Sequence, residues 1–206
     1  AVSKPKVMTV RGPVAPAELG LTSLHEHILC DLSACYRDRF RKILPAEMEM
    51  PDGPFGLEGR STLRHAMLLS SSNLRLDDER VMTAEVADFA AAGGGAIVET
   101  GSPGIRTGDD VMAFARMSQA TGVHIVACTG LYAEDSWPER FRGLSEAQYA
   151  DYLGGEIASG IGGSGILPGQ IKVAYEGRSA DADAYLRAAA RVSRESGLSL
   201  QVHVGL

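Results

Sequence analysis

Two histidines near the start of the chain, His25 and His27 in the segment LHEHI, have a type and spacing that can do chemistry. Residues two apart in an extended strand point to the same face, so the two imidazoles would project together and Glu26 would point away. Neighbouring imidazoles at a strand end can bind one cation, and imidazole is a common zinc ligand. The spacing predicts a metal site, and the alternative of solvated or packing histidines stays open.

The other three histidines differ in their surroundings. His203 lies in the C-terminal part of another expected strand, LSLQVHV, and is therefore a third candidate ligand. His124 begins an expected strand and His65 lies in a long irregular segment, so both are expected to be ordinary residues.

Lys172 lies in the middle of the apolar segment QIKVA. Burying an ammonium group is costly, and burial lowers the pKa of a lysine. A neutral amine can add carbon dioxide and become a carbamate, an anion with two oxygens that can bridge two metal ions. An edge position or a carboxylate partner would explain the lysine equally well.

Short β-branched segments alternate with longer segments of helical period. Strands are expected at 20–25, 96–99, 123–128, 170–174 and 198–204, and helices at 77–92, 109–121, 145–159 and 180–196. This alternation predicts an α/β fold with a parallel sheet, either an open doubly wound sheet or a (β/α)8 barrel. No fingerprint of the GxGxxG type opens the first expected helix and no GxxxxGK[ST] motif is present, and the glycines at 93–95 are expected to end a helix.

The segment from about 32 to 76 interrupts the alternation, with two prolines and three glycines in MEMPDGPFGLEGR. Loops of this length are uncommon unless they have a role. We expect a long insertion after the first strand, either a lid over a substrate or a plain surface excursion.

Composition limits the class of protein. The chain has 206 residues and a net charge of -6, which suits one domain over 1–206 and gives no reason to expect nucleic acid or an anionic membrane as a partner. No apolar run approaches a membrane span and no signal peptide is evident, although the missing initiator Met leaves an upstream segment open. Cys30, Cys35 and Cys128 have no CxxC spacing, so they are expected to be packing residues of a cytoplasmic protein.

These residues lie in blocks that together resemble the phosphotriesterase family of the amidohydrolase superfamily. The blocks cover nearly the whole chain apart from the insertion: TSLHEHI, NLRLDDER, AGGGAIVETGSPGI, TGVHIVACTGLY, EIASGIGGSGILPGQIKVA and LSLQVHV. The resemblance implies a TIM barrel, (β/α)8, with a binuclear metal centre at the C-terminal ends of the strands, where barrel active sites lie.

The resemblance also implies a role for each candidate residue. His25 and His27 would bind the more buried metal, His203 the more exposed one, and Lys172, N6-carboxylated by CO2, would bridge both. Some relatives have Glu at the lysine position. The implied cofactors are two divalent ions, zinc first, with Mn, Co or Fe as alternatives.

The implied activity is that of a hydrolase whose metal-bridging hydroxide attacks a small-molecule substrate. A tyrosine at the position of Tyr132 faces the substrate in the lactonase-like branch, which favours a lactone, carboxylic ester or amide; a phosphotriester is the alternative. Tyr132 could instead be an aromatic that covers the barrel rim. Trp137 and Arg140, in the same loop, are further candidates for the pocket lining. A homodimer is also implied.

The chain departs from the family pattern after Leu206. Three more strand–helix units would follow, with a histidine on the sixth strand and an aspartate on the eighth, so only about five units are present here. Five strands cannot close the barrel, and an open apolar edge favours aggregation. We expect part of a longer enzyme, and the alternative is a non-catalytic half-barrel that needs a partner.

Overall fold

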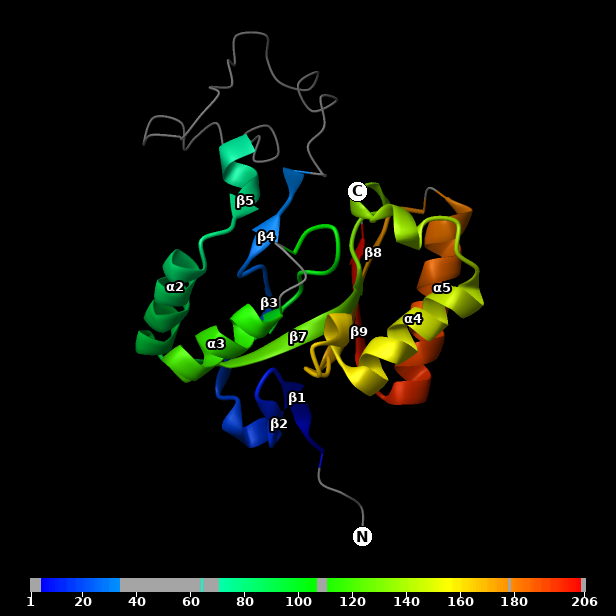
Figure 1. Ribbon diagram of the computed structural model, residues 1–206. Coiled ribbons are helices and arrows are strands. Elements are labelled where there is room, and N and C mark those ends of the chain that lie inside the picture. Colours follow the sequence, from blue (N-terminus) through cyan, green and yellow to red (C-terminus); the bar gives the residue numbers. More distant parts are fainter. Residues whose placement is uncertain (1–4, 34–63, 65–70, 107–110, 178, 205–206) are drawn as a thin grey trace.

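A five-stranded parallel sheet forms the centre of the computed structural model, which describes residues 5–33, 64, 71–106, 111–177 and 179–204 (Figure 1). Its strands are β3 (Leu21–Glu26), β6 (Gly94–Glu99), β7 (His124–Leu131), β8 (Gln170–Tyr175) and β9 (Ser199–Val204). Their order in the sheet is their order in the sequence. A doubly wound sheet reverses direction at a switch point, whereas a barrel adds strands in one direction. The fold is therefore the first part of a TIM barrel, as predicted.

The sheet is curled into a half-barrel. The side chain of Gln201 in β9 hydrogen-bonds to the backbone of Leu24 in β3, although these strands form opposite edges. Both edges carry exposed apolar side chains, among them Leu24, which is 68% exposed, and Val204, which is 69% exposed. The half-barrel thus presents apolar surface where further strands would continue the sheet.

Four helices cover the outer face of the sheet. They are α2 (Glu79–Ala91), α3 (Met112–Thr121), α4 (Glu146–Ser159) and α5 (Ala180–Ser196). Each agrees with an expected helix to within a few residues, although residues 109 and 110 of the expected helix 109–121 lie outside the described residues. α2 and α3 lie on one side of the molecule and α4 and α5 on the other (Figure 1). Ser145 and Gln148 form the expected capping box of α4.

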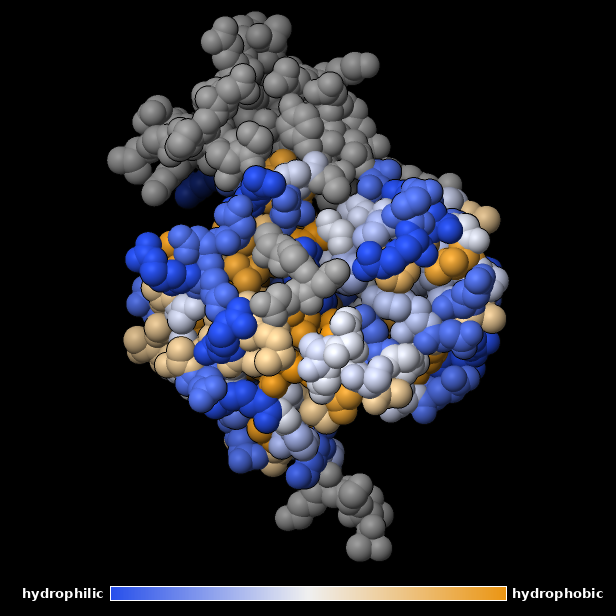
Figure 2. Space-filling model, viewed as in Figure 1, coloured by the Kyte–Doolittle hydropathy of each residue, from blue (hydrophilic) through white to orange (hydrophobic). Residues whose placement is uncertain are grey.

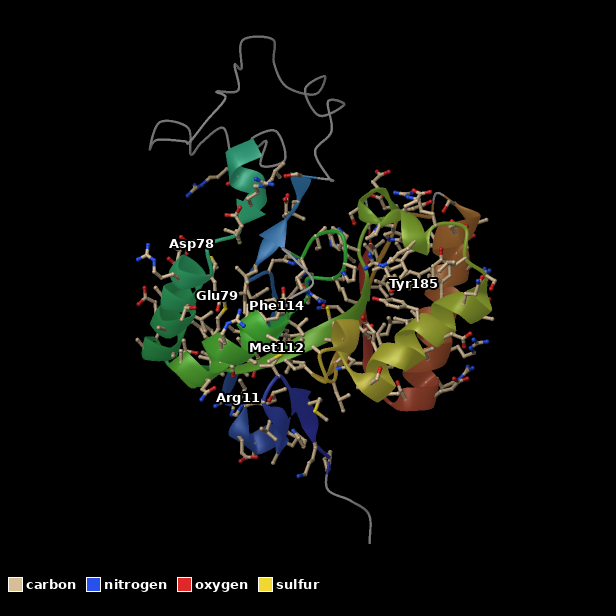
Figure 3. All side chains as sticks on the ribbon, viewed as in Figure 1. Arg11, Asp78, Glu79, Met112, Phe114 and Tyr185 are labelled. Atoms are coloured by element: carbon tan, nitrogen blue, oxygen red, sulfur yellow. The ribbon has the colours of Figure 1, made fainter. Side chains whose placement is uncertain are left out.

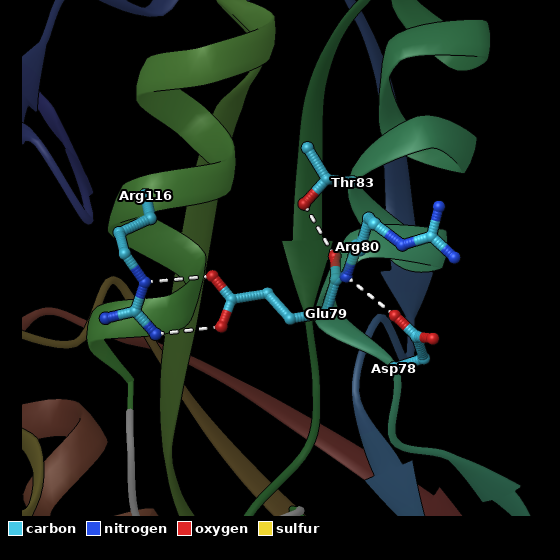
Figure 4. A network of polar contacts seen from close by, with 5 residues as sticks. All are labelled: Asp78, Glu79, Arg80, Thr83 and Arg116. Carbon is cyan, nitrogen blue, oxygen red and sulfur yellow. Dashed lines mark hydrogen bonds and ion pairs between the residues drawn. The ribbon is translucent and has the colours of Figure 1, made fainter.

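A polar network joins α2 to α3 (Figure 4). The guanidinium of Arg116 in α3 donates to both carboxylate oxygens of Glu79 at 2.9 Å. Asp78 caps α2 by accepting from the backbone N–H groups of Arg80 and Val81. The first turn of α2 is therefore fixed both within the helix and from its neighbour.

Two hydrophobic clusters hold the helix pairs against the sheet. The cluster below α2 and α3 includes Val86, Ile97, Phe114, Met117 and Ile125. The cluster below α4 and α5 includes Leu131, Trp137, Tyr149, Leu153, Ile171 and Tyr185. In Figure 2 hydrophilic residues cover much of the outer helix surfaces, and hydrophobic residues show through between the helix pairs.

Short elements close the two ends of the sheet. An antiparallel hairpin of β1 (Val7–Thr9) and β2 (Gly12–Val14) covers the N-terminal end, where Val10 N–H donates to Ile125 C=O at 2.8 Å. At the other end β4 (Cys30–Asp31) pairs with β5 (Arg75–Leu76) and so joins the two ends of the insertion. Most of the expected insertion, 34–63 and 65–70, lies outside the described residues. The short 3-10 helices are η1 (Pro16–Glu18), η6 (Ser71–Leu74), η7 (Glu134–Ser136), η8 (Glu139–Phe141) and η9 (Ile161–Gly163).

Only the first of the three consecutive glycines has the expected role. Gly93, with φ +95°, follows α2, whereas Gly94 and Gly95 are the first residues of β6. A Cβ on Gly94 would lie 2.2 Å from the ring of Phe89, and one on Gly95 would lie 2.2 Å from the carbonyl oxygen of Leu19. The latter two glycines therefore allow close packing.

Cys30 and Cys128 are buried free thiols, consistent with a packing role, and Cys35 lies outside the described residues. None of the helices in the described part of the chain is both long and apolar enough to cross a bilayer.

Candidate metal centre

The predicted site residues come together at the C-terminal ends of the strands. The rings of His25 and His27 have centroids 5.5 Å apart, that of Tyr132 is 6.2 Å from His27, and that of His203 is 5.6 Å from Tyr132. His25 is in β3 and His203 is in β9, so the two edge strands of the sheet contribute residues to the same cluster of rings. The curl of the sheet is what makes this possible.

The register of β8 and β9 places Lys172 on the same face of the sheet as His203. Lys172 pairs with Gln201, and Ala174 pairs with His203, so His203 lies two residues further along the ladder than the lysine. Two residues is one strand period, which puts both side chains on one face of the sheet. Lys172 and His203 therefore line the concave side together.

β3 differs from the regular strand expected for the histidine pair. The strand ends at Glu26, with a pairing irregularity between Ser23 and Glu26, and His27 follows it. The two imidazoles nevertheless remain neighbours. Glu26 lines a crevice beside α2 and accepts a hydrogen bond from Ser23 Oγ at 2.5 Å.

Both histidines favour the neutral form. Burial, together with the nearby His25, Lys172 and His203, lowers the pKa of His27 to about 4. Burial and the same lysine also lower the pKa of His25. Only a neutral imidazole can bind a metal ion. The Nδ1 of His27 is buried and has no hydrogen-bond partner, so this nitrogen can act as a metal ligand.

Lys172 is fully buried, and burial lowers the pKa of its amine. Its Nζ has no hydrogen-bond partner, and β8 is an inner strand between β7 and β9. Neither an edge position nor a carboxylate partner among the described residues accounts for it. A buried, unpartnered amine beside three imidazoles fits a ligand that is added later, such as a carbamate on a metal centre.

The described residues contain no cluster of three or more His, Cys, Asp or Glu side chains arranged to hold a metal ion. The three histidines thus do not form a complete binding site by themselves. The donor set fits a divalent ion once Lys172 becomes an anionic ligand beside the histidines.

The aromatic residues after β7 divide into two groups. Tyr132 lies between His27 and His203, inside the site. Trp137 is only 3% exposed and packs in the outer cluster, where its Nε1–H donates to the carbonyl oxygen of Tyr132 at 2.9 Å. Arg140 lies over the ring of Phe141, a member of that cluster. The expectation that Trp137 lines the pocket is wrong, because a buried indole needs a backbone acceptor and finds it in the outer cluster. The same expectation for Arg140 stays a prediction.

A buried carboxylate beside the site was not predicted. Glu99 ends β6 directly opposite Glu26; its Oε1 accepts from Gly101 N–H at 2.9 Å, and its Oε2 has no partner. Burial raises the pKa of Glu99 to about 7, against the opposing effect of Arg106. Arg106 donates to the carbonyl oxygens of Gly101 and Cys128. The polar run ETGS after an apolar strand was the signal in the sequence.

Comparison with known proteins gives related matches. A sequence profile described as the phosphotriesterase family matches residues 5–206. An N-acetyltaurine hydrolase from Tetraodon nigroviridis is 34% identical over 168 residues, 81% of this chain and 46% of the relative. The crystal structure of a resiniferatoxin-binding protein from Rhodobacter sphaeroides superposes with a TM-score of 0.81 at 33% identity, over 96% of this chain and 55% of that one.

A third match is the organophosphorus hydrolase from Deinococcus radiodurans, with a TM-score of 0.69 at 27% identity, over 99% of this chain and 54% of that one. The chain therefore spans about half the length of the proteins that it matches.

Proposed function

Since the chain belongs to the phosphotriesterase family, we propose that it supplies the first five strand–helix units of a metal-dependent hydrolase. The observation that carries the proposal is the buried amine of Lys172, which lacks a hydrogen-bond partner and lies on the same concave face as His203. Such an amine costs free energy in the protein as it stands, and a metal-bound carbamate would remove that cost.

His25 and His27 would hold one divalent ion, His203 would hold a second, and Lys172 would bridge them. For the bridge, the Nζ lone pair forms a bond to the carbon of CO2, one C=O electron pair moves to oxygen, and one N–H proton leaves to solvent. Burial lowers the pKa of the amine and of His27, which favours the neutral forms that these roles need. Bound metal ions supply Lewis acidity and activate water as a nucleophile. Zinc is the first candidate, followed by Mn, Co and Fe.

We propose a small molecule with a carbonyl centre, namely an amide, ester or lactone, as the substrate. The relative from Tetraodon nigroviridis is named for the hydrolysis of an N-acyl compound. Tyr132 supports the same class, because its ring lies between two candidate metal ligands, where a phenol can contact a substrate oxygen. A phosphotriester is the second candidate, favoured by the likeness to an organophosphorus hydrolase.

A non-catalytic half-barrel is the proposal of another class. The exposed apolar residues of β3 and β9 support it, since they need a covering partner whether or not the site turns over a substrate. Carboxylation and metal binding distinguish the two proposals.

The test is native intact-mass measurement with metal analysis, on the wild type, Lys172→Met and Lys6→Met. Lys6 is exposed and provides the matched control. With bicarbonate and zinc, the wild type and Lys6→Met should gain the mass of one CO2 and bind metal, whereas Lys172→Met should do neither. The catalytic proposal fails if Lys172→Met keeps the adduct and its metal, or if it hydrolyses an N-acyl amide, lactone and aryl phosphotriester panel as fast as the wild type.

A further inference from the structure

We infer that Tyr185 is a positioning residue of the metal centre, because its hydroxyl bonds to the backbone of both β7 and β8 at Lys172. The inference rests on the proposed function and names a device that acts from outside the sheet. Tyr185 belongs to α5 and is fully buried between this helix and the strands (Figure 3).

The hydroxyl of Tyr185 hydrogen-bonds to the backbone of both strands at Lys172. It accepts a hydrogen bond from Leu131 N–H at 2.6 Å and donates to the carbonyl oxygen of Lys172 at 3.4 Å. With Leu131 opposite Val173, a regular parallel ladder would join Leu131 N–H directly to that carbonyl. The phenol hydroxyl therefore bonds to the same two backbone groups that such a ladder bond joins, and it ties β7 to β8 at Lys172.

Gly130 shows that the backbone leaves no room for a side chain at this point. It pairs with Lys172 and has φ +130°, a conformation that favours glycine. An added Cβ would lie 1.9 Å from the carbonyl oxygen of Lys172 and 3.0 Å from the hydroxyl of Tyr185. Glycine is thus required at the point where the phenol meets the two strands.

A second side chain holds the next residue from the same side. Trp137 Nε1–H donates to the carbonyl oxygen of Tyr132, and the indole meets the ring of Tyr185 edge-on at 5.3 Å. Leu131 and Tyr132 are therefore fixed from outside by two side chains that contact each other. The consequence is a set distance between Tyr132 and Lys172, whose side chains belong to the concave face.

The matched variants are Tyr185→Phe and Tyr149→Phe. Tyr149 is equally buried in the same aromatic cluster, but its hydroxyl donates to the carbonyl oxygen of Phe141, remote from the β7–β8 ladder. Each variant loses one buried hydroxyl and keeps its ring, so a general effect on stability should be similar in both.

The experiment is a bicarbonate titration of the full chain with zinc present, read by the CO2 adduct on Lys172 and by bound metal, with thermal unfolding measured in parallel. Tyr185→Phe should need at least about tenfold more bicarbonate than the wild type for half of Lys172 to carry the adduct, because groups that orient metal ligands have effects of this size. Tyr149→Phe should titrate like the wild type. Equal titrations for the two variants would overturn the inference.

The failure of the proposed function is distinguishable from this result. A wild type that takes up no CO2 at any bicarbonate concentration rejects the metal centre, and the positioning role with it. A wild type that is carboxylated, with equal titrations in both variants, rejects the positioning role alone. If Tyr185→Phe does not fold, Trp137→Phe carries the test, because it removes the bond to Tyr132; a titration unchanged from the wild type then counts against the inference.

Discussion

The side-chain amide of Gln201 donates a hydrogen bond to the carbonyl oxygen of Leu24, 3.3 Å away, across the concave face of the sheet. Gln201 is also the ladder partner of Lys172. Gln201 therefore lies beside the buried lysine in the sheet and also bonds to β3, the strand that carries His25. This link places the two ends of the candidate metal centre opposite each other before any further strand is added.

Replacing Lys172 by methionine should stabilise the metal-free protein. The amine is buried without a hydrogen-bond partner, and an apolar side chain of similar length avoids the cost of about 1–3 kcal/mol that such a group carries. Urea unfolding with a chelator present and CO2 removed should give a higher midpoint for Lys172→Met than for the wild type. A lower midpoint would mean that the amine has a stabilising partner.

Gly130→Ala should be much more harmful than an alanine at a comparable glycine. Alanine is strained at the φ of +130° that Gly130 adopts, and its methyl group would also meet the carbonyl oxygen of Lys172. The strain and the contact together should cost roughly 3 kcal/mol or more. Gly122, with φ +79° and nothing within 4 Å of an added Cβ, is the control and should cost roughly 1 kcal/mol. Equal losses in denaturant unfolding would show that the contact with Lys172 is relaxed.

Asp78→Ala should destabilise the protein more than Glu79→Gln. The Asp78 carboxylate caps two backbone N–H groups of α2, and losing such a cap costs about 1 kcal/mol. The ion pair of Glu79 with Arg116 is exposed, at 41% and 53%, so its loss should cost less than about 1 kcal/mol. High salt should remove the effect of Glu79→Gln and leave most of the effect of Asp78→Ala, as read from thermal unfolding.

The sequence was sufficient for elements whose signals are local. Ser145 with Gln148 marks the start of α4, and Gly197 marks the end of α5, because capping residues act within one helical turn. The strands were located by their β-branched residues, although β7 runs three residues beyond the predicted end. The hairpin of β1 and β2 was missed, since three-residue strands carry too little periodicity to be recognised.

The candidate site was predicted where residue type alone limits the role, and missed where contacts decide it. A lysine inside an apolar strand is unusual wherever it occurs, so Lys172 was recognisable from its neighbours. Tyr185 resembles any apolar-face residue of α5, and only the fold shows its hydroxyl between two strands. Trp137 was placed on the wrong side of the sheet because a loop sequence does not show which way an aromatic ring turns.

Glu99→Gln should change how stability depends on pH. The pKa of Glu99 is raised from 4.5 to about 7 by burial, so between these values the folded state keeps a proton that the unfolded state has released. Stability therefore falls as pH rises through that window, and the glutamine variant lacks this loss.

The melting temperature of Glu99→Gln relative to the wild type should accordingly rise between about pH 5 and about pH 7 and then level off. Glu195→Gln, at an exposed position of α5, is the control and should show no such trend. A difference that stays constant with pH would indicate that Glu99 is already ionised in the folded state at low pH. Its unpartnered Oε2 would then have to face a cation rather than the apolar surroundings that raise its pKa.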